Sequence, residues 1–150
     1  MIDKRLQKHA VLNNNSKIKV AENKRQAIIL NLERKDYYVI KVDGGLIKNS
    51  IASDYVVSKL EVGDVVIELK GMDVDHAVEQ VLATAEYWSR EGLRNGEIAG
   101  MVVCSRKPSF FTKAQRFQTT FARKFNAPLH IIPRNDEFVF ERLLSFDGPK

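Results

Sequence analysis

The chain has 150 residues, 44% of them hydrophobic and 29% charged, a composition that excludes disordered and fibrous proteins and suits one folded domain. Lysine and arginine number 24 against 19 aspartates and glutamates, and the resulting net charge of +5 is a modest indication of an anionic partner, nucleic acid above all. The single cysteine, Cys104, excludes an internal disulfide and a cysteine-rich zinc site, and it favours a reducing, cytoplasmic location.

The first residues, 1–20, are predicted to form a polar leader to the single domain that residues 1–150 make up. The Asn-Asn-Asn-Ser cluster at 13–16 is a loop signal that separates this charged leader from the elements that follow. No apolar stretch near the start resembles the core of a signal peptide, and the apolar run at residues 99–104 is too short to span a membrane. We therefore expect no association with a membrane.

The first half of the chain predicts four strands, over residues 26–32, 37–42, 54–57 and 65–70. The charged turn at 33–36 predicts that the first two strands form a β-hairpin. Asp43-Gly44-Gly45 ends the second strand, because glycine accepts the backbone angles of a tight turn. In the fourth strand the period of two places Val65, Ile67 and Leu69 on one face, and Val66, Glu68 and Lys70 on the other.

The second half alternates helices and strands. The order is a helix over 74–90 with Asp73 as its N-cap, a strand over 98–104, a helix over 112–125 and a strand over 129–132. Residues from Asp136 onward predict an edge strand or a short helix. Strands followed by alternating helices and strands indicate a mixed α/β fold with a partly parallel sheet.

Asp54, Glu68 and Lys70 are the informative charged residues. Glu68 and Lys70 lie two positions apart on one strand and so share a face. If the strand that starts at Asp54 pairs beside this one, two carboxylates and an ammonium group converge at one end of the sheet. Two carboxylates offer the hard oxygen ligands that Mg²⁺ takes, and a lysine beside them could hold a water or offset phosphate charge. The alternative is a solvated strand face, and the pattern leaves both readings open.

Asp54, then Glu68-Leu69-Lys70-Gly71, then a helix that carries Gln80, resembles the PD-(D/E)XK nuclease superfamily, and small bacterial members of it in particular. The resemblance covers roughly residues 26–90 and implies a restriction-endonuclease-like core, a mixed β-sheet flanked by helices. It implies that Asp54, Glu68 and the backbone carbonyl of Leu69 bind Mg²⁺ or Mn²⁺ and that Lys70 is the catalytic lysine. It also implies that such nucleases often act as homodimers.

The helix and the flanking strands add secondary candidates. Gln80 lies on one flank of the apolar stripe, where it could contact a metal-bound water or a phosphate, or could be an ordinary boundary residue. Thr84 and Tyr87, on the same flank, are interpreted as boundary residues between core and solvent. Asp43 is a weaker candidate for the acidic cluster because Asp before glycine commonly forms turns, and Glu22 is not expected to join it.

Six cations lie within nineteen residues and have no acidic residue among them. They are Arg106, Lys107, Lys113, Arg116, Arg123 and Lys124. We predict that they form the phosphate-contacting surface, since each phosphate contact adds affinity and salt sensitivity. A solvated basic helix face is the alternative. Phe110 and Phe111, in the preceding loop, could stack on a base or pack beneath the helix.

The sequence therefore predicts a Mg²⁺-dependent nuclease that hydrolyses phosphodiester bonds in DNA, with Asp54, Glu68, Lys70 and Gln80 in its active site. The alternative function is a non-catalytic domain of the same fold that binds nucleic acid or a protein partner within a repair or phage-defence assembly. Metal-dependent cleavage of DNA by the purified protein distinguishes the two hypotheses.

Overall fold

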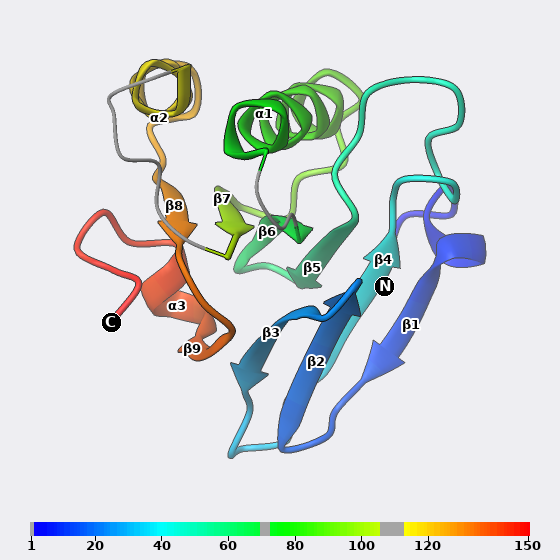
Figure 1. The fold of residues 1–150 in the computed structure, drawn as a ribbon. Coiled ribbons are helices and arrows are strands. Elements are labelled where there is room, and N and C mark those ends of the chain that lie inside the picture. Colours follow the sequence, from blue (N-terminus) through cyan, green and yellow to red (C-terminus); the bar gives the residue numbers. More distant parts are fainter. Residues whose placement is uncertain (1, 70–72, 106–112) are drawn as a thin grey trace.

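The computed structural model describes residues 2–69, 73–105 and 113–150, which form a mixed α/β fold (Figure 1). The larger sheet is mixed and contains, in spatial order, β1 (Ala10–Asn13), β4 (Tyr37–Lys41), β5 (Tyr55–Lys59), β6 (Gly63–Leu69), β7 (Glu97–Val103) and β8 (Leu129–Ile132). The smaller sheet contains β2 (Lys17–Glu22), β3 (Arg25–Leu30) and β9 (Asp136–Val139). The described helices are η1 (Gln7–His9), α1 (Val74–Arg90), α2 (Lys113–Phe125) and α3 (Phe140–Leu143).

The larger sheet is the middle layer of the molecule. Helices α1 and α2 lie side by side over one face, and the smaller sheet and α3 cover the other (Figure 1). Along β6, Val66 packs toward the helices while Val65 and Ile67 pack toward the smaller sheet. Each face of the sheet therefore has its own hydrophobic core, which explains why the central strands read as nearly continuous apolar runs.

Strand pairing brings the ends of β5 and β6 together. These two strands are antiparallel, with Tyr55 opposite Ile67. β6, β7 and β8 are parallel, and α1 and α2 are the crossover helices between them. Because parallel strands end at the same edge, the carboxyl ends of β6, β7 and β8 lie together beside the start of β5.

Helix α1 begins and ends where the sequence predicts. Its N-cap is Asp73, whose Oδ1 accepts a hydrogen bond of 3.1 Å from the backbone N–H of His76. Gly92 follows the helix with φ of +67°, a conformation that lets the chain turn away. The helix packs closely on β7, since a Cβ added to Gly100 would lie 2.6 Å from Cγ1 of Val81. No helix among the described residues is long and apolar enough to cross a membrane.

The other predicted elements match within one or two residues where the structure describes them. The strand predicted over 129–132 is β8, and those predicted over 65–70 and 98–104 are β6 and β7. The tail contains both an edge strand, β9, and a short helix, α3. Residues 70 and 112, at the ends of a predicted strand and a predicted helix, lie outside the described residues.

The predicted hairpin of residues 26–32 and 37–42 is wrong, because these strands lie in different sheets. β3 pairs with β2 and β9, whereas β4 pairs with β1 and β5. The intervening loop is organised by the buried Asn31, whose Nδ2 donates to the carbonyl oxygens of Asn15 and Lys35 at 3.0 and 2.8 Å. Its Oδ1 accepts from the N–H of Lys35 at 2.9 Å. These contacts fix a crossing between the two sheets rather than a tight turn.

The N-terminal residues are part of the fold and not a separate leader. β1 lies at an edge of the larger sheet, and β2 pairs with β3 along six residues. Ile18 and Val20 are buried, while the alternating Lys17 and Lys19 are exposed. This alternation is the pattern of a half-buried strand, which the surrounding charge and asparagines obscured.

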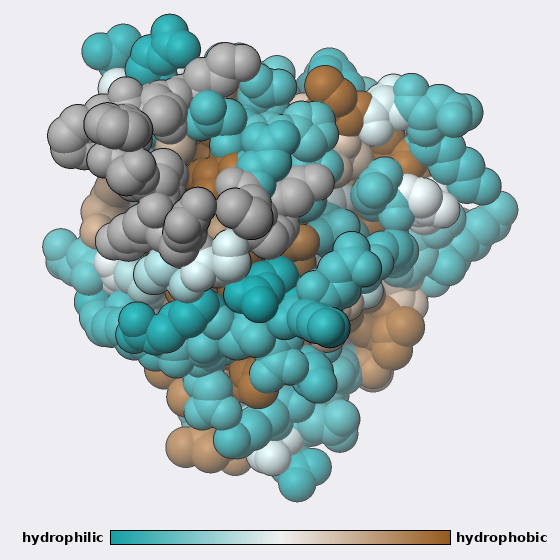
Figure 2. Space-filling model, viewed as in Figure 1, coloured by the Kyte–Doolittle hydropathy of each residue, from teal (hydrophilic) through white to brown (hydrophobic). Residues whose placement is uncertain are grey.

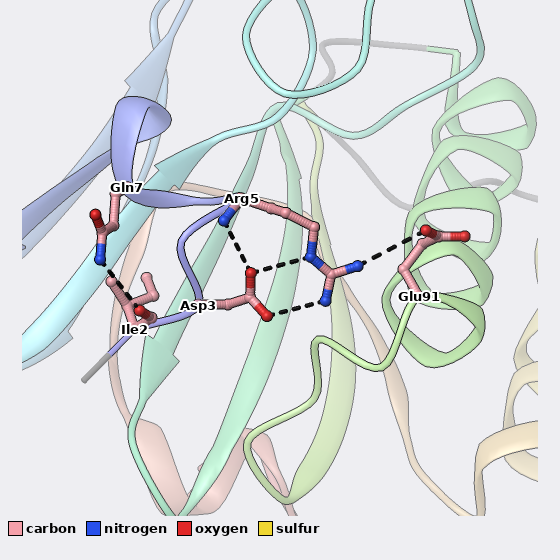
Figure 3. A network of polar contacts seen from close by, with 5 residues as sticks. All are labelled: Ile2, Asp3, Arg5, Gln7 and Glu91. Carbon is pink, nitrogen blue, oxygen red and sulfur yellow. Dashed lines mark hydrogen bonds and ion pairs between the residues drawn. The ribbon is translucent and has the colours of Figure 1, made fainter.

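A polar network fastens the chain start to the end of α1 (Figure 3). The backbone N–H and Nε of Arg5 donate to Asp3 Oδ1 at 2.8 and 3.0 Å, and its Nη2 lies 2.9 Å from Oδ2. The same guanidinium lies 3.8 Å from Glu91 Oε1, just beyond the helix. Hydrogen bonds from Arg5 lower the pKa of Asp3 to about 2. Gln7 donates to the carbonyl of Ile2 at 3.5 Å, which closes the first turn.

Candidate functional site

The two carboxylates singled out by the sequence lie against each other at the end of the β5–β6 pair. Continuing the register one step beyond Tyr55 and Ile67 places Asp54 opposite Glu68. The backbone N–H of Leu69 donates to Asp54 Oδ2 at 2.9 Å, and the N–H of Asp54 donates to Glu68 Oε1 at 3.0 Å. Each carboxylate is thus oriented by a backbone amide of the neighbouring strand.

Both carboxylates are buried, Asp54 with 8% and Glu68 with 2% of its surface exposed. Burial raises the pKa of the Asp54 carboxyl, and the hydrogen bond from Leu69 opposes this only in part. The nearby negative charges of Glu22 and Asp43 also raise the pKa of Asp54. The site therefore concentrates negative charge in surroundings that disfavour it, which is the electrostatic setting that a cation would relieve.

Helix α1 holds the segment that leads into Asp54. Gln80 Nε2 donates to the carbonyl of Ala52 at 3.1 Å, and Thr84 Oγ1 accepts from the N–H of Ser53 at 2.8 Å. Thr84 is fully buried, so its interpretation as a residue at the boundary with solvent is wrong. Gln80 Oε1 is buried and has no hydrogen-bond partner among the described residues. Gln80 thus combines a positioning contact with an acceptor still available to a ligand.

Glu22 reaches the edge of the site, so the expectation that it does not join the acidic cluster is wrong. Tyr55 Oη donates to Glu22 Oε2 at 3.4 Å, and Lys41 Nζ lies 3.7 Å from the same oxygen. The ammonium of Lys41 also lies 4.9 Å from the centre of the Tyr55 ring. Glu22 comes from the end of β2, in the smaller sheet, and only the pairing of the two layers brings it near Asp54.

The described residues bring together two carboxylates that could hold a metal ion, Asp54 and Glu68. No group of three or more His, Cys, Asp or Glu side chains in the described ranges is arranged to hold a metal ion. Asp54 and Glu68, with the adjoining backbone of Leu69, are the groups that could hold Mg²⁺, and water or substrate oxygens would complete its coordination. Lys70, the predicted catalytic lysine, lies outside the described residues.

The predicted basic surface is described only in part. Arg106, Lys107, Phe110 and Phe111 lie outside the described residues, as does the side chain of Lys113 at the start of α2. Arg116 and Arg123 are exposed and lie seven residues apart, hence on one side of α2. Lys124 differs from them, because its Nζ lies 2.7 Å from Glu86 Oε1 of α1. Part of the predicted phosphate-binding charge is therefore neutralised by an ion pair between the two helices.

The face of the molecule shown in Figure 2 is predominantly hydrophilic, with hydrophobic residues in small separate groups. Such a surface suits a polar or charged ligand better than a lipid or an apolar partner.

Comparison of the chain with models of known protein families, with curated proteins and with solved structures found no match in any of the three. The function is therefore inferred from the arrangement of this chain's own residues.

Proposed function

We propose that the chain is a nuclease of the PD-(D/E)XK type, with a restriction-endonuclease-like core, that hydrolyses phosphodiester bonds in DNA with Mg²⁺ or Mn²⁺. The observation that carries the proposal is the pairing of Asp54 with Glu68. Two carboxylates lie opposite each other at a sheet edge, and each accepts one backbone N–H from the other's strand. Burying two carboxylates side by side does not stabilise a fold, because their negative charges repel each other.

The residues present fit a divalent cation. Asp54 Oδ2 is engaged by Leu69, while its Oδ1 accepts no hydrogen bond from another described residue and remains available as a ligand. Asp54, Glu68 and the backbone of Leu69 would hold the ion. When bound, it would supply Lewis-acid polarisation of a phosphate and a lowered pKa for a bound water.

The remaining roles belong to groups around this pair. Lys70 follows Glu68 by two positions in the sequence and is the predicted catalytic lysine, whose ammonium would offset charge on the reacting phosphate. Gln80 Oε1, buried and unpaired among the described residues, would accept a hydrogen bond from the attacking water and orient it. Arg116 and Arg123 of α2 would contact phosphates farther along the DNA.

The proposal is tested by incubating plasmid and oligonucleotide DNA with the purified protein in Mg²⁺, in Mn²⁺ and in EDTA. We expect cleavage only with metal, and a loss of at least about 100-fold in Glu68→Gln and Lys70→Ala, the scale seen when one electrostatic group of an active site is removed. Glu97→Gln, an exposed glutamate at the start of β7, is the matched control and should cut like the wild type. Melting temperatures verify that each variant is folded.

Failure of the wild-type protein to cut under any metal condition would reject the nuclease. If it still binds DNA, the non-catalytic binding domain within a repair or phage-defence assembly becomes the function to pursue.

A further inference from the structure

An open hollow of about 480 Å³ lies between the β4–β5 loop and the first turns of α1. Its rim is formed by Asp43, Asn49, Ser50, Ile51 and His76. Its inner wall is closed where Gln80 Nε2 donates to the carbonyl of Ala52 at 3.1 Å. Because Ala52 precedes Asp54 by two residues, the hollow adjoins the site at which a phosphate would be cut.

The rim of the hollow consists of polar side chains and one apolar side chain, Ile51. Asn49, Ser50 and His76 are exposed, and their side chains form no hydrogen bond to another described residue. Ile51 adds an apolar surface that is 53% exposed. Among the described residues that line the hollow there is no lysine or arginine, and the one carboxylate is that of Asp43. A phosphate group is therefore disfavoured inside it.

A nucleobase matches the side chains that line this hollow. Its faces are apolar and stack on imidazole rings, which suits His76 and Ile51. Its edges carry donors and acceptors that pair with amide and hydroxyl groups, and its amino groups donate to carboxylates, which suits Asn49, Ser50 and Asp43.

We propose that this hollow is a subsite for the nucleobase of the nucleotide next to the scissile phosphate. This inference rests on the proposed function, since the nuclease reaction is what places a phosphate at Asp54 and Glu68. A base inside an intact duplex is stacked and has its pairing edge occupied, so it must leave the stack to enter the hollow. The preferred substrate is therefore DNA whose bases are unpaired: single strands, frayed ends or distorted sites.

Fluorescence anisotropy in EDTA, where no cleavage occurs, measures the contribution of the bases. The probes are labelled oligothymidylates of about eight nucleotides, within the range of single-strand site sizes, and a strand of the same length in which every nucleotide is abasic. We expect the wild type to bind the oligothymidylate five- to tenfold more tightly than the abasic strand. Ile51→Ser and His76→Ala should each reduce this ratio toward one without changing the affinity for the abasic strand.

Leu32→Ser is the matched control, because Leu32 is 85% exposed in the β3–β4 loop and does not line the hollow. If Ile51→Ser and His76→Ala keep the wild-type ratio, the hollow does not bind a base. Plasmid cleavage in Mg²⁺ separates the two proposals. If the protein cleaves DNA but binds the oligothymidylate and the abasic strand equally well, the proposed nuclease stands and the proposed base subsite is rejected. Discrimination without cleavage keeps a base-binding hollow and rejects the nuclease.

Discussion

At the scale of single residues, the burial of Asp54 makes the stability of the fold depend on pH. Its pKa is raised in the folded state by burial, so the folded protein binds that proton more tightly than the unfolded chain. The free energy of unfolding therefore falls as pH rises from the unfolded pKa through the folded one, and above that interval the ionised carboxylate is fully unfavourable. Ionisation of this buried carboxyl therefore lowers the stability of the fold, and a bound cation would offset that loss.

We expect Asp54→Asn to raise the free energy of unfolding by about 1 kcal/mol at neutral pH, or roughly 3 °C in Tm, while abolishing cleavage. Asparagine keeps an oxygen that accepts the Leu69 N–H but carries no charge to bury. Thermal unfolding followed by circular dichroism, with and without Mg²⁺, measures both effects. Mg²⁺ should raise the Tm of the wild type and not that of the variant, because only the folded wild type binds the ion.

Asp147→Asn, at an exposed aspartate near the C-terminus, is the control and should leave the Tm unchanged. A variant at Asp54 less stable than the wild type would show that the carboxylate serves the fold rather than a metal.

At the scale of elements, α1 positions the segment that leads into Asp54 through Thr84. Thr84→Val preserves shape but leaves the buried N–H of Ser53 without its 2.8 Å acceptor, and we expect a loss of about 1–3 kcal/mol in the free energy of unfolding. Thr84→Ser retains the hydroxyl and should lose less than half as much. Urea denaturation of the three proteins measures the difference, and equal losses in both variants would mean that the hydroxyl is not the relevant group.

The sequence predicts elements well where the information is local. The stripe of apolar residues and the N-cap Asp73 determine α1, and the alternation around Glu68 determines which face of β6 each side chain occupies. Strand partners are not local information, which is why β3 was assigned to β4 rather than to β2 and β9. The hydrogen bonds of Asn31 that direct the chain between sheets involve Asn15, sixteen residues away, and no turn motif reports them.

In the candidate site too, the sequence predicts the residues whose placement depends on local information and not the others. Asp54 and Glu68 could be placed together because they lie on strands adjacent in sequence, joined by a short turn. Thr84 was missed because a threonine on a helix flank has the same pattern whether it faces solvent or a backbone N–H. Glu22 was missed because it comes from the other sheet, and no pattern in its own segment indicates contact with Tyr55.

At the scale of the whole molecule, the basic residues of α2 differ in whether they form ion pairs. Lys124 is paired with Glu86, whereas Arg116 and Arg123 form no ion pair with another described residue and lie along one side of α2. Two residues seven positions apart on a helix are separated by about 10 Å along its axis, which allows each to meet a different phosphate. Arg116 and Arg123 should therefore contribute more to the salt dependence of binding than Lys124 does.

We expect the double variant Arg116→Ala, Arg123→Ala to reduce the slope of log Kd against log salt for duplex DNA by roughly 2, since each lost phosphate contact removes about 0.9. Lys124→Ala is the matched control on the same helix and should change the slope by much less, because its ammonium is already neutralised by Glu86. Anisotropy titrations at several KCl concentrations give the slopes. Equal slopes for the wild type and the double variant would place the phosphate contacts elsewhere, whereas a large effect of Lys124→Ala alone would mean that DNA displaces the ion pair between α1 and α2.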